Sequence, residues 1–127
     1  MFREKFIAKV PESIIDSARF STKPWQRTFK IACWVRFHMP RHNKIALMLH
    51  YTDDEGNKSA QIDRCCTELE ITVLLSANAT LAGRGKVKEM SLYLQVDDNS
   101  APYVIDELYV QSCEKGAALQ PKIISAA

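Results

Sequence analysis

Apolar and polar residues alternate along much of this chain. In residues 25–39, and again in residues 44–51, every second position is apolar, while the positions between them are polar or mixed. This period of two is typical of a strand with one buried face, because successive side chains point to opposite sides of the strand. The pattern therefore predicts two strands, and the turn-forming residues 40–43 predict that these strands pair as a hairpin.

The same alternation predicts further strands. Polar turns rich in Asp, Asn and Gly separate several of them, as expected of residues that favour tight turns. No long segment has apolar residues at the i, i+3, i+4 and i+7 spacing of a helix, so the pattern indicates a sandwich or barrel. The further predicted strands are residues 5–10, 58–64 (a short edge strand), 67–77, 88–97, 103–112 and 122–125 (another edge strand), with a helical turn at 12–17 and a loop at 78–85.

The side chains predicted to fill the core occupy one parity of the long strands. We expect them to meet between two layers, in an all-β fold built as an antiparallel two-sheet β-sandwich. The predicted core positions are Phe29, Ile31, Cys33, Val35, Phe37, Met39, Ile45, Leu47, Leu49, Tyr51, Leu69, Ile71, Val73, Leu75, Ala77, Met90, Leu92, Leu94 and Val96.

Composition fits a single domain over residues 1–127, with a tail at 114–127 that we expect to be partly ordered. The chain is 46% hydrophobic and 25% charged, and its 17 basic and 15 acidic residues leave a net charge of +2. So small a charge argues against a nucleic-acid surface. No apolar run approaches the roughly 18 residues of a membrane span, and the charged start lacks the apolar core of a signal peptide. We therefore expect a cytoplasmic protein or a domain excised from a secreted one.

The cysteines are too sparse for a disulfide scaffold and show no C-x-x-C spacing. We expect free thiols. One cysteine falls on a core position, and at most one of the vicinal pair should be buried, because neighbours on a strand face opposite ways. The four residues are Cys33, Cys65, Cys66 and Cys113.

Three stretches of the chain have an order and spacing seen in one family of binding domains. They are KPWQRTFKIACWVRF at residues 23–37, IALMLHYTDDEGN at 45–57 and MSLYLQVDDNSAPYVIDELYVQ at 90–111. Together they resemble the jelly-roll carbohydrate-binding modules of the galactose-binding-like superfamily. The resemblance implies a jelly roll that binds a ligand without chemistry, closed by a hairpin in the third stretch. The chain departs from the family at 65–67, where Cys-Cys-Thr replaces a tryptophan, and in its opening segment.

The resemblance also implies a candidate metal site. In that family a calcium ion often joins the termini near an aspartate of the last strand, and Asp106 matches that aspartate. A structural calcium is thus the one cofactor to consider. The other interpretation is that Asp106 bonds to nearby backbone, as buried carboxylates commonly do.

Positions outside the predicted core carry the groups that a carbohydrate site needs. Sugar rings stack on exposed aromatic side chains, and sugar hydroxyls bond to Arg, Gln, Glu or His. If the strands pair suitably, these residues form one ligand-binding surface, with Trp34 as its most informative member, because large exposed aromatics mark contact surfaces. The candidates are Trp34, Arg36, Met48, His50, Tyr93, Gln95, Glu107 and Tyr109.

Other interpretations stay open. The N-terminal segment or the tail could cover this surface and make Trp34 and Tyr93 a second core, because Trp is highly buried on average. The same surface also suits a subunit contact in a protein-interaction or oligomer-assembly domain. Trp25 is expected to anchor a loop. A small hydrolase is disfavoured, because no nucleophile motif is present and His38 and His42 flank a proline instead of sharing a helix face.

Overall fold

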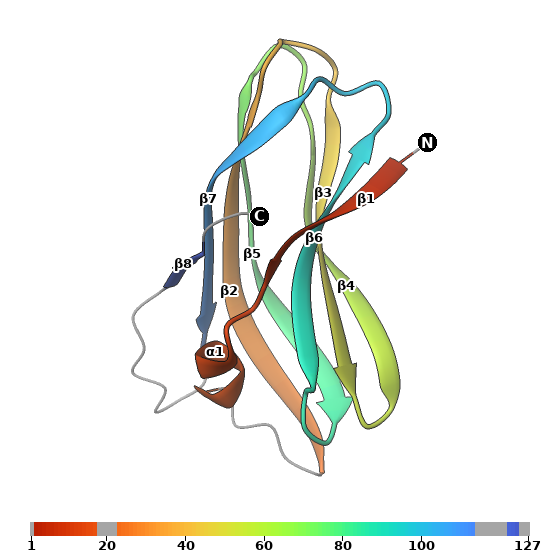
Figure 1. Ribbon diagram of the computed structural model, residues 1–127, viewed down its shortest axis with the longest axis vertical. Coiled ribbons are helices and arrows are strands. Elements are labelled where there is room, and N and C mark those ends of the chain that lie inside the picture. Colours follow the sequence, from red (N-terminus) through yellow and green to blue (C-terminus); the bar gives the residue numbers. More distant parts are fainter. Residues whose placement is uncertain (1, 18–22, 114–121, 125–127) are drawn as a thin grey trace.

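The computed structural model describes residues 2–17, 23–113 and 122–124. Within these parts of the chain, two four-stranded antiparallel sheets pack face to face and one short helix lies beside them (Figure 1). The predicted two-sheet sandwich is confirmed, while the jelly-roll connectivity stays a prediction. No helix among the described residues is long and apolar enough to cross a membrane.

Each sheet has two central strands between two edge strands. Sheet A lies on the right of Figure 1 and sheet B on the left. Sheet A has the order β1 (Phe2–Lys9), β6 (Glu89–Asp97), β3 (Lys44–Asp53) and β4 (Gly56–Cys66). Sheet B has the order β5 (Thr72–Arg84), β2 (Pro24–Phe37), β7 (Tyr103–Ser112) and β8 (Lys122–Ile124), and helix α1 (Glu12–Ser17) contacts β7.

The core lies between the sheets and follows the predicted alternation. In β2 the predicted positions from Phe29 to Phe37 are buried, whereas Met39 follows the end of the strand and is exposed. The predicted positions of β3 and β6 are buried too, except that Val96 is half-buried. Burial raises the pKa of the Cys33 thiol to about 12, so this cysteine behaves as a small apolar side chain. Period-two burial therefore builds the interior.

Two predicted hairpins are wrong. Residues 38–43 carry the chain from sheet B to sheet A, so β2 and β3 are not hydrogen-bonded neighbours. Buried Asn43 holds this crossing: its Oδ1 accepts a 2.7 Å bond from the backbone N–H of Ala101, and its Nδ2 donates to the carbonyl of Arg41. Residues 98–102 cross between β6 and β7, so the third resembling stretch is not a hairpin either. Buried polar anchors of this kind fix crossings that alternation cannot reveal.

The fifth strand is displaced from its predicted position. Leu69 and Ile71 are 78% and 42% exposed, because residues 67–71 form a bend in which the Glu70 carboxylate accepts the backbone N–H groups of Glu68 and Leu69. The predicted loop at 78–85 is instead mostly strand. There β5 pairs with nearly the whole length of β2, from Arg36 opposite Thr72 to Pro24 opposite Arg84. Long-range pairing thus overrides the weak local pattern.

The remaining short elements agree with prediction. β1, α1, the edge strand β4 and the edge strand β8 all form near their expected positions. β4 and β5 are edge strands of different sheets that contact each other, and the Asp63 carboxylate of β4 accepts a 2.9 Å bond from the backbone N–H of Ser76 in β5. Asp63 thereby joins the two sheets along one side of the sandwich.

One end of the sandwich is closed around buried Asp53. Its carboxylate accepts the backbone N–H groups of Glu55 and Arg84 and lies 3.0 Å from Lys58 Nζ. Trp25 is buried within β2, and its indole N–H donates to the carbonyl of Gly85, so it anchors the loop that follows β5, as predicted. The two sheets are therefore bonded to each other at this end.

Candidate functional site

The predicted ligand-binding residues do not form one surface. They divide between the outer faces of the two sheets, because β2 and β7 belong to sheet B while β3 and β6 belong to sheet A. In a sandwich these faces point in opposite directions. Trp34, Arg36, Glu107 and Tyr109 lie on the sheet B face, whereas Met48, His50, Tyr93 and Gln95 lie on the sheet A face.

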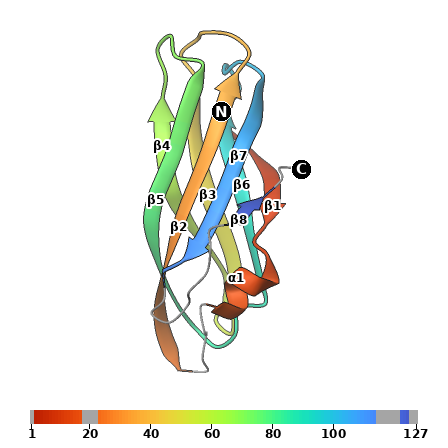
Figure 2. The ribbon, with the colours of Figure 1, turned by 90° about the vertical axis from the view of Figure 1, so that its left-hand side faces the viewer.

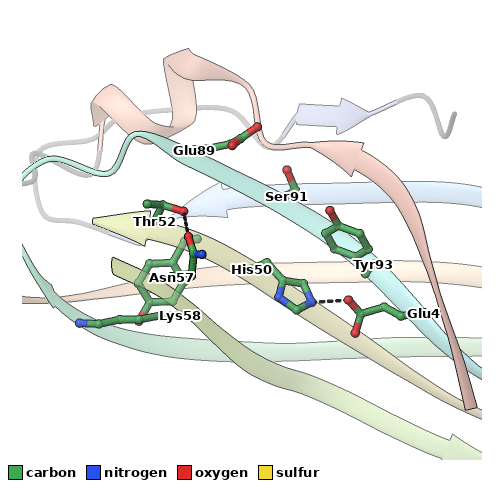
Figure 3. Close-up of a pocket in the computed structure, with 9 residues that line it drawn as sticks. Glu4, His50, Thr52, Asn57, Lys58, Glu89, Ser91 and Tyr93 are labelled. Carbon is green, nitrogen blue, oxygen red and sulfur yellow. Dashed lines mark hydrogen bonds and ion pairs between the residues drawn. The ribbon is translucent and has the colours of Figure 1, made fainter. Parts of the chain in front are cut away.

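The sheet A face carries a polar hollow of about 320 Å³ (Figure 3). Four strands contribute to it: β1, β3, β4 and β6. Its lining combines hydroxyl and carboxylate groups with one side-chain amide and with the half-buried ring of Tyr93. The lining residues are Glu4, His50, Tyr51, Thr52, Asn57, Lys58, Glu89, Ser91 and Tyr93.

A contact between distant segments forms one side of the hollow. His50 Nε2 lies 2.6 Å from Glu4 Oε1, although the two are not aligned as a hydrogen bond. The Tyr93 ring sits edge-on to the His50 ring, with 4.6 Å between centroids, and packs against Phe6 at 5.6 Å. Gln95 donates from Nε2 to Glu4 Oε2 over 3.2 Å. Together these contacts join the N-terminal strand to the centre of sheet A.

The charged groups at the other side of the hollow are mostly paired. Lys58 Nζ contacts both Asp53 and Glu55, which raise the pKa of its ammonium group, and Glu89 lies 3.5 Å from Lys9. Thr52 donates to Asn57 Oδ1 over 2.8 Å. By contrast, the hydroxyls of Ser91 and Tyr93 make no hydrogen bond within the part of the chain described.

The sheet B face is more apolar. Trp34 pairs across strands with Leu74 on one side and Glu107 on the other, and the two apolar side chains are 39% and 42% exposed. Beside them, Ala32 lies between Ser76 and Tyr109 in a shallow hollow of about 310 Å³. Trp34 is thus on the outside, as predicted, and is not part of a second core. Tyr93 on the other face is half-buried between two rings.

A β-bulge in β7 explains why two consecutive acids face outward. Trp34 is opposite Glu107 and Val35 is opposite Ile105, so Asp106 is the extra residue and shares the exposed side with Glu107. Arg36 binds Asp106 through two bonds of 3.1 and 3.0 Å, and this hydrogen bonding lowers the pKa of the Asp106 carboxyl.

These contacts do not fit the calcium site implied by the resemblance. The Asp106 carboxylate is exposed and held by a cation, and no cluster of three potential metal-ligating side chains occurs among residues 2–17, 23–113 and 122–124. The alternative of a bond to nearby backbone does not describe this carboxylate either, because its partner is the Arg36 side chain. We therefore assign Asp106 to an ion pair.

Glu4 is a site residue that the sequence interpretation missed. In the sequence only one feature points to Glu4: it lies between Phe2 and Phe6 at alternate positions of β1, so the three side chains share one face of the strand. Its contact with His50 depends on a register that joins β1 to β6 and β6 to β3, strands that are far apart in the sequence.

Comparisons with known proteins leave the site to be interpreted from its own chemistry. No protein-family model, curated protein or solved structure matches the chain. His50 and Ser91 are cross-strand partners, yet no hydrogen bond joins them in the described parts of the chain. The arrangement thus offers hydrogen-bonding groups and a ring, but no contact between a nucleophile and a base.

Proposed function

We propose that this protein is a non-catalytic binding module for a carbohydrate or a similarly polar ligand, and that the hollow on the sheet A face holds this ligand. One observation carries the proposal: four strands bring a phenol ring and several hydrogen-bonding side chains into the same hollow. Ligand sites typically combine a concave shape with a few convergent polar groups that fix orientation.

The available groups match the chemistry of a polyhydroxyl ligand. Ser91 and Tyr93 supply hydroxyls that can both donate and accept, and their hydrogen-bonding capacity is not used within the described chain. Glu4 supplies an acceptor and Asn57 an amide. Because Lys58 is already paired with two carboxylates, the hollow is not a strongly cationic site. A neutral polar ligand therefore suits it better than a phosphate.

The other predicted residues have different parts in this proposal. His50 forms the wall beside Glu4, and Gln95 orients the Glu4 carboxylate. Met48 is the cross-strand neighbour of Tyr93. Trp34, Arg36, Glu107 and Tyr109 lie on the opposite face and do not contact this hollow.

A glycan array followed by calorimetry tests the proposal. We expect at least one neutral oligosaccharide to bind, and Tyr93→Phe, which removes only a hydroxyl, to weaken binding by about 1 kcal/mol. Tyr109→Phe makes the same change on the sheet B face and should leave affinity unchanged. Failure of every glycan to bind, or weakening by Tyr109→Phe alone, would overturn the assignment.

A further inference from the structure

The sheet B face has the features of a contact surface. β5, β2 and β7 run side by side there, and no described helix or strand lies in front of β2 (Figure 2). At its centre Trp34 and Leu74 form an exposed apolar pair. A tryptophan in such a position is the side chain most often found to dominate binding energy in interfaces.

We infer that this face binds a second copy of the chain through a two-fold contact, an inference independent of the proposed carbohydrate site. The cross-strand register supports it. Lys30 lies two residues before Ala32 on β2, and Trp34 lies two residues after it with Glu107 alongside. Consider a two-fold axis that lies in the interface, perpendicular to the strands and level with Ala32. It places Lys30 of each copy opposite Trp34 of the other copy and next to its Glu107.

The two-fold symmetry brings Lys30 of one copy next to Glu107 of the other, so that opposite charges meet. Lys30 and Glu107 are both exposed and border the same hollow, and neither has an ion-pair or hydrogen-bond partner within the described residues. In the two-fold arrangement each Lys30 lies opposite both an acid and an indole side chain, and aromatic rings attract cations. The nearby Arg36 and Asp106 are already paired within one copy. A uniformly acidic or basic partner would pair with only one of these two charges, whereas a second copy pairs with both.

The size of the face predicts a weak dimer. Three strands about 4.8 Å apart and about ten residues long, at about 3.3 Å per residue, present roughly 500 Å² of flat surface. Two copies would then bury roughly 1,000 Å², the lower end for a specific contact. We expect reversible self-association that grows with concentration.

Sedimentation velocity from low-micromolar to near-millimolar concentration gives the first test. We expect a monomer–dimer equilibrium, together with concentration-dependent protection of tryptophan fluorescence from a soluble quencher. Because Trp25 is buried, the quenchable signal comes mainly from Trp34. Trp34→Ala should weaken the dimer about 30-fold. A monomer at every concentration would overturn the inference.

Charge reversal gives the more specific test. Lys30→Glu and Glu107→Lys should each weaken self-association roughly tenfold, because each places like charges opposite one another twice. A mixture of these two variants restores opposite charges at both contacts and should associate at least as well as the unmodified protein. Arg64→Glu, on β4 at the edge of sheet A, is the matched control and should have no effect.

Each variant is first confirmed to be folded by circular dichroism. Self-association that survives both reversals, or a mixture no stronger than its components, would show that the two-fold contact at Ala32 is wrong. Restoration by mixing cannot arise from misfolding, so a single destabilised variant does not obscure the result.

Discussion

The outer faces of sheet A and sheet B arise from the same alternation of residues, yet their side chains are held differently. On the sheet A face, Tyr93, His50 and Glu4 contact one another and form the wall of a hollow. On the sheet B face, Trp34 and Leu74 are exposed side by side. Alternation therefore decides which side chains lie outside the core, but strand order decides which of them meet.

The largest expected effect comes from the end of the sandwich where the two sheets are bonded to each other around Asp53. A Cβ at Gly83 would lie 2.1 Å from Asp53 Oδ2 and 2.5 Å from a ring carbon of Trp25, both buried. We expect Gly83→Ala to lower the free energy of unfolding by about 3 kcal/mol through overpacking. Urea denaturation measures this.

Gly56→Ala is the control for that prediction. Gly56 has a φ of 112° and open space around its Cβ position, so only backbone strain opposes alanine there. We expect a loss of about 1 kcal/mol. A Gly83→Ala protein as stable as the unmodified one would show that this close packing does not hold the two sheets together.

Lowering the pH should change the stability of the fold more through a buried aspartate than through an exposed one. Burial opposes ionisation of Asp53, but bonds from Lys58 and from two backbone N–H groups outweigh it and lower the pKa of its carboxyl below the usual 3.8. A lowered folded-state pKa stabilises the fold above the unfolded-state pKa, and this stabilisation is lost as pH falls through the folded value. Stability should therefore fall below about pH 4.

Paired variants measure this acid effect. We expect Asp53→Asn to lower stability at neutral pH by about 2 kcal/mol, because Lys58 and a backbone donor lose their acceptor. It should also flatten the pH dependence between pH 5 and pH 2. Asp106→Asn removes an exposed carboxylate whose pKa is also lowered, and should change the profile far less. Equal changes from both variants would contradict the distinction.

Two aromatic truncations compare the faces directly. Tyr93→Ala removes edge-on contacts with His50 and Phe6, and should cost about 1–2 kcal/mol of unfolding free energy. Trp34→Ala removes a larger ring from an exposed position and should cost under about 0.5 kcal/mol. Thermal and urea unfolding at low protein concentration give both values, and the reverse order would show that the Tyr93 ring contributes less to stability than the exposed Trp34 ring.

The smallest expected effect is that of the ion pair on the sheet B face. Arg36→Gln breaks the two bonds to Asp106, but both groups are exposed and screened by salt. Unfolding midpoints at low and high ionic strength should match those of the unmodified protein. A salt-dependent loss of stability would mean that this pair also holds the bulge in β7.

Sequence predicted the core of the fold because burial on one side of a strand leaves a local signature. The inward positions from Phe29 to Phe37 and from Ile45 to Tyr51 were identified correctly for this reason. In β5 the predicted positions Val73 and Leu75 are buried too, but the extension of the strand beyond residue 77 was not predicted, because Ala79 and Gly83 are too small to mark an inner face. Sheet membership was not predictable either, since the crossings depend on Asn43 and other long-range bonds.

The candidate site shows the same division. Trp34, His50 and Tyr93 were correctly placed outside the core, because each lies on the opposite parity from buried neighbours. Their separation onto two faces, and the contact of His50 with Glu4, follow from strand order and register. The outward turn of Asp106 follows from a bulge, and a bulge adds one residue without a distinctive sequence signal.

The bond from Ser76 to the Asp63 carboxylate has a consequence for how copies of this protein can meet. An unsatisfied backbone donor on a border strand is a template for fibril-like growth, in which one molecule prolongs the β-ladder of the next. Here a carboxylate occupies that donor and adds negative charge at the seam between β4 and β5. Molecules crowded together are thereby discouraged from polymerising along this seam.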